Sequence, residues 1–220
     1  MVETKHTRKA KFLDIIRTPL ISVVLILTVG CGTDDEDNST AIICENTQYP
    51  DQTTSEYLLP WSIGETYQVG QGNCTDFSHG SENNQLFAYD FFMPIGTSIR
   101  AARSGTVAAV ADNFRDGSDV VGQENFIIIR HDDNSVSRYA HLTLQGALFD
   151  LGDTVIQGEV IALSGNSGFS TAPHLHFDVN DGDCPILTND CESLPVTFRN
   201  TSEHPNGLVE GVSYTAEPIN

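Results

Sequence analysis

Short apolar or alternating segments, separated about every ten residues by Gly, Asn, Asp or Pro, fill the chain beyond Trp61. Alternation with a period of two is typical of strands that bury one face, and no long stretch there follows the 3.6-residue period of a helix. The sequence therefore predicts an all-β fold, a compact antiparallel β-sheet of the barrel or sandwich kind. The predicted strands are residues 86–92, 98–101, 105–111, 125–131, 135–141, 154–156, 159–164 and 174–180.

Two of these strands are joined by a recognisable turn. Residues 125–131 and 135–141 flank Asp132-Asp133-Asn134, residue types that accept the backbone angles of a tight turn. We therefore expect an antiparallel hairpin over residues 125–141.

The first 30 residues differ from the rest of the chain. Basic residues precede an apolar run from Leu20 to Val29, which ends at Gly30-Cys31, and this is the layout of a secretory signal peptide. At about 1.5 Å per residue the run covers only about half of a hydrocarbon core roughly 30 Å thick. Cleavage is therefore favoured over a retained membrane span.

The end of this run, Thr28-Val29-Gly30-Cys31, resembles a bacterial lipobox, in which the cysteine is lipidated and becomes the mature N-terminus. By this resemblance residues 1–30 are a lipoprotein-type signal peptide, and lipid on Cys31 anchors the exported protein to a membrane. Gly32 after the cysteine, in place of Asp, favours the periplasmic face of the outer membrane. An ordinary secretory peptide cleaved nearby is the alternative.

Acidic residues dominate the chain, whose formal net charge is −19. Five of the 11 basic residues and two of the 30 acidic residues lie within residues 1–30, so the remainder holds 6 basic and 28 acidic residues, a formal charge of −22. Such an excess repels nucleic-acid phosphates, so nucleic acid is excluded as a partner. Residues 31–55 begin with a polar, acidic stretch and are predicted to form a tether.

Four cysteines remain once Cys31 is assigned to lipid, an even number in a compartment that permits disulfides. Three pairings of Cys44, Cys74, Cys184 and Cys191 are possible. We favour Cys184–Cys191, which closes a short local loop, together with Cys44–Cys74. A site of four thiolates around zinc is the alternative, but the chain has no C-x-x-C spacing to support it.

The strongest local signal for chemistry is Pro173-His174-Leu175-His176-Phe177-Asp178-Val179. Side chains alternate faces along a strand, so His174 and His176 are expected on one face, about 7 Å apart, and Leu175 and Phe177 on the other. Such a pair allows one imidazole to bind a metal while the other reaches what the metal binds. A polar strand face with two incidental histidines is the alternative.

Three further residues stand out near predicted strands. His141 ends the second strand of the hairpin, where a neighbouring strand could bring it to the same face. Asp90 lies within an apolar stretch, where a carboxylate is costly to bury unless it is paired or binds a metal. His79 precedes it in Ser78-His79-Gly80. We expect His131 to be structural and His204, in a turn-rich tail, to lie on the surface.

These residues belong to a series of motifs in a fixed order, spread from Gly70 to Val179. With that series the chain resembles the lysostaphin-type, or LytM-like, zinc endopeptidases. The motifs are the His79 and Asp90 pair, Gly-Thr-x-Ile-x-Ala-Ala-x-x-Gly (96–105), Tyr-x-His-Leu (139–142), Ser-Gly-x-Ser-Gly (164–168) and His-Leu-His-Phe (174–177).

The resemblance implies one zinc ion per chain, held by His79, Asp90 and His176, with His141 and His174 as the catalytic histidines. It implies a peptidase domain at residues 56–181, with its core at 70–179, and leaves residues 182–220 as a C-terminal extension. One departure stands out. The family's first two ligands are spaced His-x-x-x-Asp, whereas ten residues separate His79 from Asp90 here.

The function implied by the resemblance is zinc-dependent hydrolysis of the peptide crosslinks of bacterial peptidoglycan. Some proteins of this family have lost ligands and only bind and activate other cell-wall hydrolases, and such a non-catalytic regulator is the alternative. The complete ligand set favours the enzyme. The resemblance covers enzymes that cut glycine bridges and enzymes that cut stem-peptide crosslinks.

Overall fold

The computed structural model describes residues 45–75, 77–80, 84–183 and 191–219. The chain divides into two units, Met1–Thr33 and Asp34–Asn220, and every described residue belongs to the second. The predicted signal peptide and Cys31, the predicted lipidation site, therefore lie outside the described residues. Within the described ranges no helix is long and apolar enough to cross a membrane.

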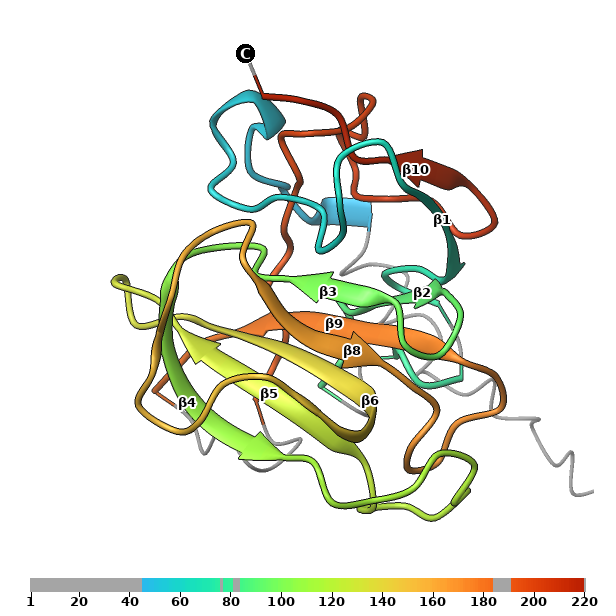
Figure 1. Ribbon diagram of the computed structural model, residues 1–220. Coiled ribbons are helices and arrows are strands. Elements are labelled where there is room, and N and C mark those ends of the chain that lie inside the picture. Colours follow the sequence, from blue (N-terminus) through green and yellow to red (C-terminus); the bar gives the residue numbers. More distant parts are fainter. Residues whose placement is uncertain (1–44, 76, 81–83, 184–190, 220) are drawn as a thin grey trace, which may run out of the picture. The chain divides into compact units, whose positions relative to one another are not determined.

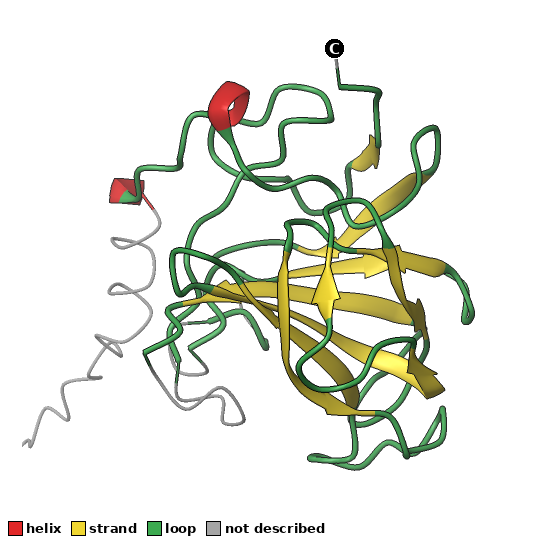
Figure 2. Ribbon diagram, turned by 60° about the vertical axis from the view of Figure 1, so that its left-hand side comes forward, coloured by secondary structure: helices red, strands yellow, loops and turns green. Residues whose placement is uncertain are grey.

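Ten strands form one antiparallel sheet, and the helical turns among the described residues are short (Figures 1 and 2). The predicted all-β, antiparallel fold is confirmed. The elements are η1 (Gln52–Thr54), β1 (Thr66–Gln71), β2 (Tyr89–Phe92), β3 (Ser98–Arg100), β4 (Gly105–Ala111), β5 (Asn125–Arg130), β6 (Val136–Ala147), β7 (Thr154–Val155), β8 (Val160–Ser164), β9 (His174–Asn180) and β10 (Ser213–Thr215).

The strands follow the order β10-β1-β2-β9-β6-β5-β4-β7, and the β3–β8 pair branches from β6. The long strand β6 makes this branch possible. Its first half pairs with β5 and β9, and its second half pairs with β8 through Leu142↔Ser164 and Ala147↔Ala162. His141 and Gln145 both adopt positive φ (57° and 56°), and the register of β6 with β8 shifts between Leu142 and Ala147.

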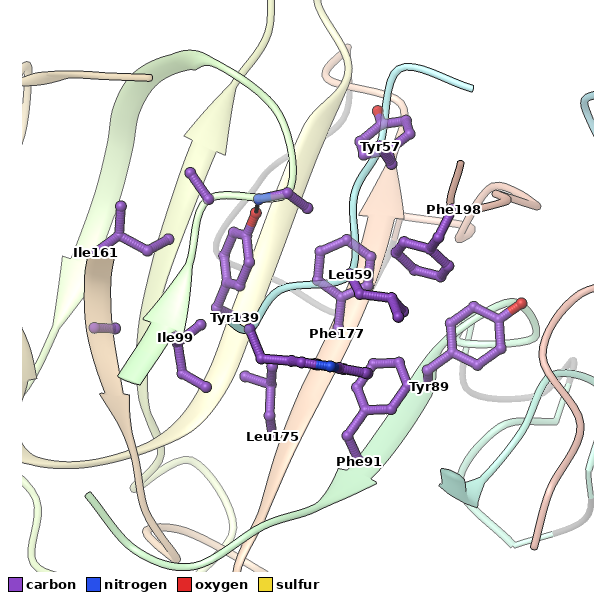
Figure 3. Close-up of a cluster of buried hydrophobic side chains, with 14 of the residues drawn as sticks. Tyr57, Leu59, Tyr89, Phe91, Ile99, Tyr139, Ile161, Leu175, Phe177 and Phe198 are labelled. Carbon is purple, nitrogen blue, oxygen red and sulfur yellow. Dashed lines mark hydrogen bonds between the residues drawn. The ribbon is translucent and has the colours of Figure 1, made fainter. Parts of the chain in front are cut away.

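The main core contains side chains from the β3–β8 branch and from the central strands. Ile99 of β3 and Ile161 of β8 belong to the same cluster as Tyr139, Leu175 and Phe177, and Figure 3 shows these side chains together. The Tyr139 hydroxyl accepts a hydrogen bond from the Ala102 backbone N–H (2.7 Å), so its polar end is satisfied inside the core. This packing leaves the opposite face of β9 for other side chains.

The eight predicted strands are all present. Their ends differ from the predicted ends by up to three residues, except in β6, which continues to Ala147. The hairpin is also confirmed: Arg130 pairs with Val136 across the turn, and Asn134 there has a φ of 71°. The sequence did not indicate β1 or β10. Each has only one buried residue, Val69 and Tyr214, and so lacks the hydrophobic alternation that marks a half-buried strand.

The C-terminal segment is part of the same structure. Phe198, Leu208 and Tyr214 are buried in the main core, and β10 extends the sheet beside β1. The Asn200 side-chain oxygen accepts a hydrogen bond from the Leu59 backbone N–H (2.8 Å), which ties this segment to residues before β1.

The surface position predicted for His204 is wrong. This side chain is buried, and its Nε2 accepts a hydrogen bond from the Phe198 backbone N–H (2.9 Å). The turn-rich sequence around it gave no sign of this packing. Cys74 and Cys191 are both disulfide-bonded, whereas Cys44 and Cys184 lie outside the described residues, so the predicted pairing stays a prediction.

Candidate metal centre

Three neighbouring strands, β2, β9 and β6, bring the predicted site residues together. His176 of β9 pairs with Asp90 of β2 on one side and with Ala140 of β6 on the other. Leu175 and Phe177 point into the core, so His174 and His176 occupy the opposite face, as the alternation predicts. The register therefore places the carboxylate of Asp90 beside His176 and leaves His141, one residue after Ala140, close by.

The nitrogen and oxygen atoms of His79, Asp90 and His176 form a group that could hold a metal ion. One ligand atom from each lies within 4.8 Å of the others. Asp90 Oδ1 is 3.4 Å from His79 Nε2 and 2.9 Å from His176 Nδ1. The structure thus brings His79 to Asp90 despite the ten residues between them, some of which, 81–83, are not described.

His79 supplies the observation that best fits a metal ion. The side chain is fully buried, and its Nε2 has no hydrogen-bond partner among the residues that the structure describes. A buried polar atom without a partner is costly, and a metal ion is one way to satisfy it. The donor set, two imidazoles and one carboxylate, suits a divalent ion that accepts nitrogen and oxygen ligands.

Hydrogen bonds fix which nitrogen of each histidine faces this group. His79 Nδ1–H donates to the Gly72 carbonyl oxygen (3.0 Å), which leaves Nε2 directed at Asp90. His176 Nε2–H donates to Asp178 Oδ2 (2.9 Å), which leaves Nδ1 of His176 also directed at Asp90. Outer partners of this kind hold the ring and the tautomer that a metal ligand needs.

Asp178 is a residue of the site that the sequence did not single out. It is buried, and its second oxygen accepts a hydrogen bond from the Asn180 side chain. The signal was available in the strand pattern, since Asp178 lies two residues after His176 and so shares its face. The argument applied to Asp90, a carboxylate in an apolar strand, applies equally to Asp178.

The charges within the group are strongly coupled. Burial alone would raise the pKa of Asp90, but the adjacent imidazoles of His176 and His79 hold that pKa well below its usual value. Burial likewise opposes the charged form of His176, yet Asp178 and Asp90 raise its pKa above the ordinary value. Asp90 is therefore ionised at neutral pH, as a metal-binding carboxylate must be.

His141 and His174 form a second pair beside the metal group. Their ring centroids are 4.5 Å apart, and His174 Nε2 lies 3.6 Å from Asp90 Oδ1. His141 Nδ1–H donates to the Ser167 carbonyl oxygen (2.7 Å), and His174 Nδ1–H donates to the Ala172 carbonyl oxygen (2.8 Å). Each imidazole therefore keeps Nε2 for other partners.

Burial, followed by the nearby His174 and His176, lowers the pKa of His141 to about 4. A histidine with this pKa is neutral at pH 7 and able to accept a proton. The positive φ of His141 is unusual for a residue with a side chain, and strained residues of this kind cluster at functional sites.

A cleft of about 860 Å³ opens on this face of the sheet. Asp90, His141, His174 and His176 line it, together with residues from the loops on either side. The four predicted residues on the strands thus face one cavity, and His79 is buried beside Asp90. His131 lies elsewhere, directly after β5, and its Nδ1–H donates to the Ser104 carbonyl oxygen (2.9 Å), just before β4.

Comparison with known proteins finds a family match for part of the chain. Residues 85–187 match peptidase family M23. Lysostaphin of Staphylococcus simulans is 32% identical over 124 residues, which are 56% of this chain and 23% of that protein. The peptidoglycan DD-endopeptidase ShyA of Vibrio cholerae is 36% identical over 90 residues, 41% of this chain and 19% of that protein. The chain spans about a quarter or less of the length of these relatives.

Among solved structures, that of the antimicrobial peptidase lysostaphin from Staphylococcus simulans aligns with a TM-score of 0.48 at 28% identity, over 64% of this chain and 51% of that one. The resemblance inferred from the motifs is confirmed by the family match and by these relatives in sequence. The chain contains a domain of peptidase family M23, at residues 85–187.

Proposed function

We propose that this protein is a zinc-dependent endopeptidase that hydrolyses the peptide crosslinks of bacterial peptidoglycan. The observation that carries the proposal is the buried Nε2 of His79, which faces Asp90 Oδ1 and His176 in a group that could hold a metal ion. Three protein ligands leave a fourth tetrahedral position open, as catalytic zinc sites do and structural ones do not.

Zinc held by these three residues, one ion per chain, would lower the pKa of a bound water towards about 7 and polarise the scissile carbonyl. The remaining work falls to the histidine pair. His141 is neutral at pH 7 and its Nε2 is available, so it can take a proton from the attacking water. His174, whose ring is held by the Ala172 carbonyl oxygen, shares the acid and oxyanion-stabilising roles.

The substrate assignment is supported by the relative in sequence that is named a peptidoglycan DD-endopeptidase, ShyA of Vibrio cholerae. It agrees with export and with a lipid anchor on Cys31, which we propose from the sequence alone. Growth with a labelled fatty acid tests the anchor. Label on the wild-type protein that is lost in Cys31→Ala supports it, whereas equal labelling of both proteins contradicts it.

The test of the enzyme assignment uses purified protein and purified sacculi. Zinc content is measured first, and the peptides released from sacculi are then identified by mass spectrometry with and without a chelator. We expect about one zinc per chain and peptide release that the chelator abolishes. The alternative, a non-catalytic regulator of other cell-wall hydrolases, would be supported if the protein bound no zinc, released no peptide and activated a partner amidase.

A further inference from the structure

Exposed phenylalanine side chains gather at the cleft. Phe77, Phe92 and Phe169 are 78%, 46% and 53% exposed, and all three line the cleft that contains the histidines. The other phenylalanines among the described residues are buried or half-buried. Val121, 81% exposed, lines the same cleft. Apolar side chains concentrated in one concave site indicate a surface that binds a ligand. We call these four residues the phenylalanine rim.

Phe92 lies on β2, and Phe169 lies in the loop that precedes β9, so both are close to strands that carry the site residues. Phe92 follows Asp90 by two residues and so shares its face of β2, where it pairs directly with His174 of β9. Phe169 precedes Ser170, whose hydroxyl oxygen lies 3.2 Å from His174 Nδ1. A substrate that reaches His174 would therefore pass both rings.

Gly70 of β1 makes room for the ring of Phe92. A Cβ at residue 70 would lie 2.6 Å from Phe92 Cζ, closer than such atoms approach in proteins. The absence of a side chain at Gly70 thus allows the ring to lie where it does. This contact also offers a way to displace the ring without removing it.

The cleft offers little charge apart from the predicted site residues. Its other charged lining residues are Glu124 and Arg138, which form an ion pair with each other. Neutral polar side chains such as Gln85 and Thr171 also line the cleft. Substrate groups next to the phenylalanine rim itself therefore meet apolar surface rather than a cation or an anion. Contacts of this kind favour a side chain with a methyl group over glycine, which has no side-chain carbon for the rings to contact.

We propose that the phenylalanine rim selects peptides that carry alanine beside the scissile bond over glycine-only bridges. This inference rests on the proposed endopeptidase function. A hydrophobic pocket that distinguishes one methyl group changes kcat/KM by about tenfold or more. The alanine peptide is tested with L-alanine and with D-alanine. We expect the better of these two peptides to be cleaved about tenfold more efficiently than a glycine peptide of the same length.

The experiment measures kcat and KM for both peptides with the wild type, Phe92→Ala, Phe169→Ala and Gly70→Ala. Each rim variant should lose most of the preference, chiefly because KM for the alanine peptide rises, while zinc content stays at the wild-type level. Gly70→Ala should act in the same direction because it displaces the Phe92 ring. Leu151→Ala is the matched control, since Leu151 is 72% exposed and is not among the residues that line the cleft.

Two kinetic outcomes overturn the inference: a wild type that cleaves the glycine peptide as well as the alanine peptide, or rim variants that keep the preference. Binding of fluorescent peptides to chelator-treated protein separates this inference from the proposed function. If neither peptide is cleaved, tighter binding of the alanine peptide that is lost in Phe92→Ala still supports the rim. Equal binding of the two peptides contradicts it.

Discussion

His176 and Asp90 lie on paired strands in the middle of the sheet, whereas His79 lies in the loop between β1 and β2. The strand residues are positioned by register, so their separation follows from the pairing of β2 with β9. His79 is positioned by one hydrogen bond to the Gly72 carbonyl oxygen and by burial. The candidate ligand group thus combines two residues held rigidly by strand pairing with a third residue whose position depends on a loop.

The largest effect is expected from the rigid pair. Replacing either strand ligand, in His176→Ala or Asp90→Ala, removes one of three donors and leaves the others unable to satisfy the metal. We expect bound zinc to fall to a few per cent of the wild-type level and hydrolysis of sacculi to be lost. Zinc per chain is measured by atomic spectroscopy. Near wild-type zinc in either variant, with the fold intact by circular dichroism, contradicts the ligand assignment.

The next effect separates catalysis from metal binding. In His141→Ala and His174→Ala the ligand group is unchanged, so zinc should be retained while kcat falls by about 10²- to 10⁴-fold, the usual size of an acid–base contribution. Steady-state kinetics on a soluble crosslink peptide give kcat, and zinc content is measured on the same samples. Loss of zinc from either protein would show that the residue holds the metal.

A smaller effect is expected at Asp178, which acts through His176. Asp178→Ala removes the acceptor for His176 Nε2–H (2.9 Å) and should weaken zinc affinity by about 10- to 100-fold. Asp178→Asn keeps a side-chain oxygen at that place and should lose less. Competition with a chromogenic chelator measures the affinity, and Asp150→Asn, in an exposed loop, is the control. Equal affinity in all three variants would show that Asp178 does not support the ligand.

The smallest predicted effect concerns stability, away from the site. Burial lowers the pKa of His131 below its ordinary value of 6.5, so as pH falls below about 6.5 the unfolded chain binds a proton that the folded chain does not. The contribution of His131 to the free energy of unfolding should therefore decline on acidification through this window. Urea unfolding of chelator-treated protein at pH 7.5 and 5.5 measures it. The change should be smaller in His131→Gln, and an equal change would contradict the prediction.

The sequence could predict the part of the site that strands carry. His174 and His176 share a face because side chains alternate, and Asp90 stands out because its strand is otherwise apolar. The same rule would have found Asp178, had it been applied beyond the histidines. The exposure of Phe92 could not be predicted in this way, because it depends on Gly70 and on the loops around the cleft.

Other features depend on contacts between distant segments. β1 and β10 have too few buried residues for a periodic signal, so only their pairing identifies them as strands. The burial of His204 follows from its contact with Phe198, which the local sequence does not specify. The meeting of His79 with Asp90 likewise depends on the path of a loop rather than on a repeat.

We propose that His79, which the loop between β1 and β2 positions beside Asp90, is the third ligand of the metal group. Zinc content of His79→Ala, measured beside the wild type and beside His131→Ala as a buried-histidine control, tests it most directly. We expect about one zinc per chain in the wild type and in His131→Ala, and only a few per cent of that in His79→Ala with the fold intact. A folded His79→Ala protein that retains its zinc would contradict it.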